Sequence, residues 1–301
     1  MELWIPITIF AAFLQNLRSS LQKYLKGRLT TLGATFSRFA FAAPLACLYV
    51  AGLAGLAGLS LPSPTAAFAV YGLVGAVAQI LGTATLVYIF SFRNFAVGTT
   101  LSKTETVQTA LFGFIVLDET ISRTGSLAIL LSLVGVMMIS VSRSSMTARD
   151  LMSSLLDRTA LIGVASGAFF GISAVAYRAA SLSLDGGDFI MRAAFTLAFV
   201  TIFQTVVMSA YMRITEPGQI RKVLSCWKVS GWVGFVGWLG SVCWITAMTL
   251  QNAAYVRALG QIELLFTLAV SYFFFRERSS MWELSGITLV TVGILALVLW
   301  N

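Results

Sequence analysis

Long apolar runs separated by short polar breaks fill almost the whole chain. Each run is close to the ~20 residues that a helix needs to cross a bilayer, and none has the period-two alternation of a strand in a membrane barrel. The pattern therefore predicts an all-α integral membrane protein with ten transmembrane helices. They are expected at 3–22, 33–58, 66–90, 95–117, 124–141, 159–181, 188–212, 228–250, 254–275 and 281–300.

The composition supports this pattern and narrows the chemistry. Hydrophobic residues make up 58% of the 301 residues and charged residues 11%, whereas soluble domains carry about 25% charged residues. Histidine is absent, and Cys47, Cys226 and Cys243 stand neither close together nor beside acidic clusters. We therefore expect no metal and no cofactor, and the chain has no Gly-x-Ser-x-Gly elbow that would indicate an enzyme.

The net charge of +8 is unevenly distributed over the loops. Loops after odd-numbered helices hold most of the Lys and Arg, from Lys23 to Arg278, whereas those after even-numbered helices hold Arg123 and Arg178. The positive-inside rule then predicts a multi-pass protein of the cell inner membrane, with both termini outside. We expect the lipid bilayer, and not nucleic acid, as the partner of this charge. The N-terminus lacks signal-peptide features and should remain.

The stretch 142–158 differs from the rest of the chain. Leu151, Leu155 and Leu156 alternate with Ser, Arg and Asp, as in a short amphipathic helix that lies on a membrane surface. This pattern divides the chain into two units, 1–141 and 159–301, joined by an amphipathic linker.

The two units resemble each other in sequence. A shift of 158 residues places Glu105 on Glu263, and a shift of 154 places Arg38 on Arg192. Each unit has five predicted helices, and because five is odd, the second unit is inverted relative to the first. Two inverted repeats around a site at the membrane midplane are typical of secondary transporters.

The ends of both units carry a family resemblance. The stretch 110–119 followed by Gly125–Gly135, and the stretch 268–277 followed by Gly286–Gly293, resemble the EamA domain of the drug/metabolite transporter superfamily. An Arg early in each second helix extends the resemblance, which covers nearly the whole chain as two EamA units. It implies ten helices, alternating access and transport of a small metabolite. Members carry amino acids, nucleotide sugars, vitamins or xenobiotics, so the substrate stays open.

Glu105 and Glu263 are the sharpest candidates for function. Ionisable groups inside a bilayer are costly unless they face a cavity or a partner, and these two are expected near mid-membrane at equivalent positions. Either they bind and release protons during transport, or they are structural carboxylates that hold the two units together.

Cations accompany both acids. Lys103 lies two positions from Glu105, about 200° around a continuous helix, so the two do not pair within it. In the second unit Gln261 is the equivalent of Lys103, and Arg257 shares its face. Each unit thus offers one cation that either attracts an anionic substrate or neutralises the acid of the other unit; we favour the second.

Further candidates come from polar and aromatic positions within the predicted helices. Arg38 and Arg192 either extend to the nearer interface or clamp a carboxylate or phosphate. Gly163, Gly167 and Gly171 form a face on which another helix can pack closely. The remaining candidates for lining a polar or aromatic substrate site are Arg18, Gln15, Trp238, Trp244, Tyr88, Tyr177 and Tyr255.

These observations predict a secondary active transporter for a small anionic or zwitterionic solute, such as an amino acid or an organic acid. Protons are the expected coupling ion, unless the protein works by exchange. A channel, or a sensor or scaffold with a transporter-like fold, are the alternatives. The sequence does not give the direction of transport or the oligomeric state.

Overall fold

The structure, a computed structural model, describes residues 2–92, 95–143, 157–266 and 280–300. Within these ranges the chain is helical apart from turns, connections and one isolated bridge between Ser63 and Asp185. Seven of the described helices are long and apolar enough to cross a membrane. The chain is therefore a multi-pass, all-α membrane protein, as the hydrophobic pattern predicted.

The described helices follow the predicted runs closely at most positions. In chain order they are α1 (Trp4–Leu25), α2 (Thr31–Gly55), α3 (Ala66–Ile89), α4 (Phe95–Ser102), α5 (Glu105–Leu117), α6 (Arg123–Arg143), α8 (Arg158–Leu182), α9 (Phe189–Thr215), α10 (Gln219–Ser225), α11 (Trp227–Leu250), α12 (Ala253–Gly260) and α14 (Met281–Trp300).

Local sequence explains where several of these helices begin. Thr30 and Thr65 accept hydrogen bonds from the backbone amides of Gly33 and Phe68, each at 3.1 Å, before α2 and α3. Asn252 accepts one from Ala254 at 2.8 Å before α12. These side chains replace backbone acceptors that the first turn of a helix lacks, so each helix starts at its polar residue.

The predicted helix 95–117 is wrong as a continuous element. It is interrupted at Lys103 and Thr104, whose amides donate to the carbonyls of Thr100 and Leu101, three residues earlier, at 3.1 Å. This tighter turn separates α4 from α5. Glu105 is therefore the first residue of a helix, and the angle of about 200° between Lys103 and Glu105 that a continuous helix would impose does not apply.

The predicted helix 254–275 is interrupted in the same way. The amides of Gln261 and Ile262 donate to carbonyls three residues earlier, at 3.1 and 3.0 Å, and helix resumes over 263–266. The rest of this predicted helix lies outside the described residues. So does most of the amphipathic stretch 142–158, and the division into two units stays a prediction. The short helix α10, before α11, was not predicted.

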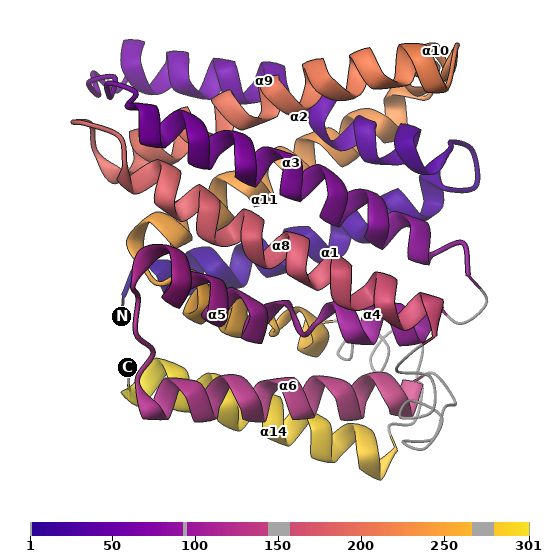
Figure 1. Cartoon of the computed structure of the whole chain (residues 1–301), viewed down its shortest axis with the longest axis vertical. Helices are drawn as coiled ribbons and strands as arrows, with labels where there is room; N and C mark the ends of the chain where they lie inside the picture. Colours follow the sequence, from indigo (N-terminus) through magenta and orange to yellow (C-terminus); the bar gives the residue numbers. More distant parts are fainter. Residues whose placement is uncertain (1, 93–94, 144–156, 267–279, 301) are drawn as a thin grey trace.

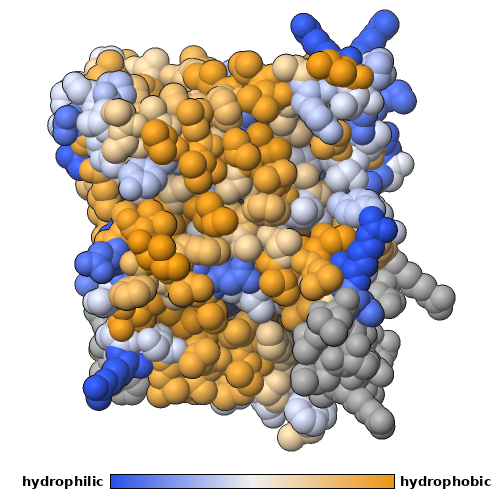
Figure 2. Space-filling model, in the orientation of Figure 1, coloured by the Kyte–Doolittle hydropathy of each residue, from blue (hydrophilic) through white to orange (hydrophobic). Residues whose placement is uncertain are grey.

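The helices lie across the long axis of the molecule, stacked from α9 and α10 at one edge to α6 and α14 at the other (Figure 1). Both termini lie at one end of the helices, together with the connections 56–65, 118–122 and 183–188. The connection 26–30 and α10 lie at the opposite end, which we call the basic end because it carries Lys26, Arg28, Arg221 and Lys222. Apolar residues dominate the face between the two ends, and the most hydrophilic ones gather towards the ends (Figure 2).

Glycines of α8 bring the interrupted segment close to it. A Cβ atom at Gly163 would lie 2.3 Å from the carbonyl oxygen of Gly98 in α4. At Gly167 it would lie 2.8 Å from the carbonyl oxygen of Ser102. Only glycine permits this approach of two backbones, which confirms the predicted packing face and places the backbone of Ser102 and Glu105 against α8.

Candidate functional site

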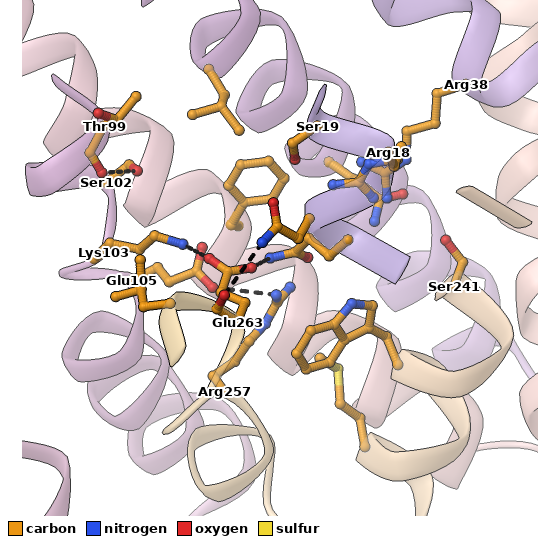
Figure 3. A pocket seen from close by; sticks show the side chains of 18 of the residues that line it. Arg18, Ser19, Arg38, Thr99, Ser102, Lys103, Glu105, Ser241, Arg257 and Glu263 are labelled. Carbon is orange, nitrogen blue, oxygen red and sulfur yellow. Dashed lines mark hydrogen bonds and ion pairs between the residues drawn. The ribbon is translucent and has the colours of Figure 1, made fainter. Parts of the chain in front are cut away.

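A cavity of about 360 Å³ lies between the helices and is rich in charged side chains (Figure 3). Residues of α1, α2, α3, α4, α5, α8, α11 and α12 contribute to it, together with Lys103 in the first interruption and the helical stretch 263–266 after the second. Its lining is Gln15, Asn16, Arg18, Ser19, Arg38, Gln79, Leu86, Phe90, Thr99, Ser102, Lys103, Glu105, Phe170, Tyr177, Ser241, Trp244, Ile245, Met248, Arg257, Glu263 and Leu264.

Glu263 pairs with Lys103 across the cavity. The Lys103 ammonium contacts Oε1 of Glu263, and Gln15 Nε2 donates to Oε2 at 2.9 Å. Asn16 Nδ2 donates to the Glu263 backbone carbonyl at 3.3 Å. Both carboxylate oxygens therefore have donors, one of them charged, which satisfies an ion in a poorly hydrated place.

Glu105 pairs with Arg257 in the same cavity. Arg257 Nη1 lies 3.2 Å from Glu105 Oε1, and the guanidinium carbon lies 4.7 Å from the centre of the Trp244 ring. The ring face attracts the cation and covers it from one side. Only 8% of the Arg257 side chain and 13% of the Glu105 side chain are exposed, so this pair is well buried.

The two ion pairs cross between the two interrupted segments. Lys103, in the turn before α5, reaches Glu263, while Arg257, in α12, reaches Glu105. Each cation thus neutralises the acid of the other interrupted segment, which is the pairing favoured from the sequence. Glu105 is the first residue of α5, and Glu263 is the first residue of the helical stretch 263–266.

Arg18 and Arg38 line the cavity beside these pairs, and both side chains are buried. Arg38 Nη1 donates to Thr83 Oγ1 at 2.9 Å. The Nε atom of Arg18 is buried and has no hydrogen-bond partner in the described part of the chain. None of the ion pairs found among the described residues includes either arginine.

A polar cluster forms another part of the wall. Tyr177 donates from its hydroxyl to Gln79 Oε1 at 3.0 Å, and Gln204 Nε2 donates to Gln79 Oε1 at 3.0 Å and to the Tyr177 hydroxyl at 3.1 Å. Gln204 is completely buried behind the other two. These bonds hold the Tyr177 ring at the cavity wall. Gln204 was missed, although a Gln within an apolar run is a signal for a buried polar contact.

Five of the predicted site residues do not line the cavity. Gln261 donates to Thr106 at 2.8 Å, and Arg192 donates to the carbonyls of Gly186 and Gly187 at 2.9 and 3.2 Å. The rings of Tyr88 and Trp238 contact Phe92 and Tyr49, respectively. The Tyr255 hydroxyl accepts a hydrogen bond from the Ser122 amide at 3.1 Å. Arg192 thus sits at the start of α9, at an end of the bundle, and follows the interfacial interpretation of the two offered for it.

The other residues proposed from the sequence do line the cavity: Gln15, Arg18, Arg38, Lys103, Glu105, Tyr177, Trp244, Arg257 and Glu263. Asn16, Ser102 and Ser241 were missed. Asn16 and Ser102 directly adjoin predicted residues, so proximity in sequence was the available signal.

The cavity lining reaches towards both ends of the bundle, with Met248 near the end of α11 on the side of the termini. Phe90, directly after α3, and Thr99, in α4, belong to it. Towards the termini, Arg178 donates from Nε to Glu119 at 2.6 Å and from Nη1 to the carbonyls of Met248 and Gln251 at 2.6 and 2.7 Å. One side chain thus ties the end of α5, α8 and the end of α11 together. The described residues contain no group of His, Cys, Asp and Glu that could hold a metal ion.

Comparison with known proteins shows a similarity of fold and nothing beyond it. No protein-family model and no curated protein matches the chain. A crystal structure of a protein with 15% sequence identity superposes with a TM-score of 0.71, over 99% of this chain and 96% of the other. At that identity the likeness extends to the fold over the full length of both chains and carries no activity.

Proposed function

We propose that the protein is a secondary transporter that moves a small organic solute across the membrane by alternating access. The observation that carries the proposal is the pair of crossed ion pairs at two helix interruptions inside one cavity. Interrupted helices and buried charges that face a cavity are features of transporter substrate sites. A purely structural bundle gains little from four buried charges, because hydrophobic packing is as stabilising without them.

The interruptions support a two-unit organisation of the proposed carrier. The turn at Lys103 and Thr104 recurs 158 residues later at Gln261 and Ile262. This equivalence fits ten helices arranged as two inverted five-helix repeats, 1–141 and 159–301, of the EamA type. In such a carrier the crossed pairs join the two repeats, and rocking of the repeats breaks and remakes them.

The cavity fits an anionic or zwitterionic solute, with a proton as the coupling ion or with exchange of one solute for another. Purified protein in liposomes tests this: preloaded unlabelled solute should accelerate uptake of the labelled solute, and the rate should saturate. A channel gives neither counterflow nor an uptake rate that saturates with solute concentration. A sensor or scaffold gives no flux at all, so the two alternatives separate from the carrier and from each other.

The same proposal includes the orientation, with the basic end in the cytoplasm and both termini outside. The tie made by Arg178 then closes the outer side, and the lining near Phe90 and Thr99 faces the inner side. A reporter protein fused to the C-terminus, active only in the cytoplasm, should stay silent in cells. An active reporter would reverse the orientation and leave the fold as it is.

A further inference from the structure

The charges in the cavity do not balance. Four cations and two carboxylates line it among the described residues, and each carboxylate is engaged by one cation, Lys103 or Arg257. Arg18 and Arg38 remain, with two positive charges and no carboxylate partner of their own. Buried charges without a partner are strongly unfavourable in a poorly hydrated place, so these two point to a ligand that brings the opposite charge.

Both arginines are built into the structure and are not mobile surface groups. Their relative exposures are 4% each. A guanidinium has five N–H donors; the Nε of Arg18 is buried with no acceptor, and Arg38 donates from Nη1 to Thr83. Most of their donors are thus available to a bound molecule in the cavity that both residues line.

One glycine places the two side chains side by side. A Cβ atom at Gly237 of α11 would lie 3.3 Å from Arg38 Cγ and 3.4 Å from Arg18 Cδ, so both stems pack over this position. The two side chains lie next to each other at one side of the cavity, apart from the crossed pairs (Figure 3). Two planar forks held together suit a compact group with several acceptor oxygens.

The described part of the cavity offers no comparable binding site for the ammonium group of a zwitterion. Glu105 and Glu263 are the acids that line it, and both are already paired. Beyond the arginines the wall is apolar at Phe170, Ile245 and Leu86. This separates two solutes that the proposed function allows: a zwitterion would have to displace a cation from its acid, whereas a dianion would not.

We infer that Arg18 and Arg38 form an anion subsite and that the substrate is an organic dianion with an apolar body, of phosphate-monoester or dicarboxylate type. This inference rests on the proposed function. The dianionic group binds between the two guanidinium groups, and the apolar body extends towards Phe170 and Ile245. The pairs at Lys103 and Arg257 are then free for the conformational cycle.

Binding to the purified full-length protein in detergent tests the inference with four probes that share a phenyl body: phenyl phosphate, phenylsuccinate, phenylacetate and phenylalanine. Measurements at pH 8 keep the phosphate dianionic, since its second pKa is about 6, and sodium chloride equalises the ionic strength. We expect at least one dianion to raise the unfolding temperature in a saturable manner. The dianion that does so identifies the type, and phenylalanine should have no effect.

The variants Arg18→Gln and Arg38→Gln should each weaken binding of that dianion about ten- to a hundredfold, because a charged pair of hydrogen bonds is lost. Arg192→Gln is the matched control, since Arg192 lies at the start of α9 outside the cavity, and it should bind normally. Arg18→Lys and Arg38→Lys keep the charge without the fork; they provide a second reading should the Gln variants fold poorly, and they should be weakened too.

Outcomes against the inference differ from outcomes against the carrier. Saturable binding of phenylalanine that survives Arg18→Gln and Arg38→Gln overturns the dianion site and leaves the transporter standing. So does dianion binding that is weakened equally in the Arg192→Gln control, because the effect is then nonspecific charge attraction. Absence of solute counterflow in liposomes overturns the transporter and, with it, the inference that rests on it.

Discussion

The two helix interruptions begin with the same pair of backbone hydrogen bonds but differ in their side chains. Both end in a glutamate that opens the next helical stretch, yet the first turn contains Lys103 where the second contains Gln261. The second cation, Arg257, stands one turn earlier, inside α12 and under Trp244. The Lys103–Glu263 pair is therefore the more accessible one, with 23% of the Lys103 side chain exposed against 8% for Arg257.

This difference suggests a division of labour between the two ion pairs. The covered pair, Arg257–Glu105, has the less exposed cation, and the Trp244 ring covers it, so this pair should act mainly as a structural link. The accessible pair, Lys103–Glu263, shares its acid with Gln15 of α1 and can exchange one partner for another at lower cost. We expect the accessible pair to be the one that opens during transport.

The largest effect should come from breaking the covered pair. Arg257→Gln leaves the Glu105 carboxylate buried without a cation, which costs roughly 3–5 kcal/mol of unfolding free energy for a buried pair. Lys103→Gln is the matched variant. It should cost clearly less, because Glu263 keeps its hydrogen bond from Gln15 when the ammonium group is removed. Unfolding in mixed detergent micelles measures both, and equal losses would remove the distinction.

Loss of transport activity should be larger for the accessible pair than for the covered pair, the reverse of the order for stability. Glu263→Gln imitates a permanently protonated acid and cannot bind or release a proton at this position. We expect it to lower proton-driven uptake in liposomes at least about a hundredfold, the lower end of the usual loss when a group that transfers protons is removed. The response to external pH should also disappear: uptake would no longer rise when the outside is acidified.

Glu105→Gln serves as the control for that measurement. Its folded yield should fall, but the protein that remains should keep a pH-dependent uptake. A pH response that persists unchanged in both variants would rule out both acids as coupling groups. A response lost only in Glu105→Gln would assign the coupling role to the covered pair and reverse the comparison.

Exchanging the charges of the accessible pair sharpens the comparison further. Lys103→Glu and Glu263→Lys should each reduce stability, and the double variant should recover part of the loss. The expected coupling is about 0.5–3 kcal/mol, the range for residues in direct contact. The same cycle measured with Lys103→Glu and Glu105→Lys should show weaker coupling, because Lys103 contacts Glu263 and not Glu105.

Much of the architecture follows from hydrophobic pattern, and the site follows from symmetry. The long helices begin and end within a few residues of the apolar runs, because lipid forces every backbone group into helical hydrogen bonds. Glu105 and Glu263 stand out since each is an acid within an apolar run, at matching positions. The pattern does not mark the interruptions, because neither 101–104 nor 259–262 contains Pro. Their polar residues also fit the cavity-facing side of a continuous helix.

The orientation of individual side chains was the other limit. Arg38 and Arg192 occupy matching sequence positions, yet Arg38 lines the cavity and Arg192 bonds to the connection before α9. The difference depends on which neighbouring helix each one meets. Likewise, the partners of Arg178 come from the ends of α5 and α11, and no spacing within α8 reveals them. Contacts between distant segments are set by packing and not by periodicity.

The smallest expected effect concerns the cover over Arg257. The Trp244 ring packs directly against Gly260 of α12, where a Cβ atom would lie 2.4 Å from it. This packing holds the indole over the Arg257 guanidinium. Trp244→Phe keeps an aromatic ring with a weaker pull on the cation, and it should cost no more than about 1 kcal/mol of stability at a partly desolvated site. Trp238→Phe, two turns earlier in α11 and outside the cavity lining, controls for the loss of an indole.

If the cover is what distinguishes the two pairs, Arg257→Gln should cost less stability in the Trp244→Phe background than in the natural one, while Lys103→Gln should cost the same in both. An unchanged cost of Arg257→Gln would mean that burial by the helices alone, and not the ring, makes this pair the structural one.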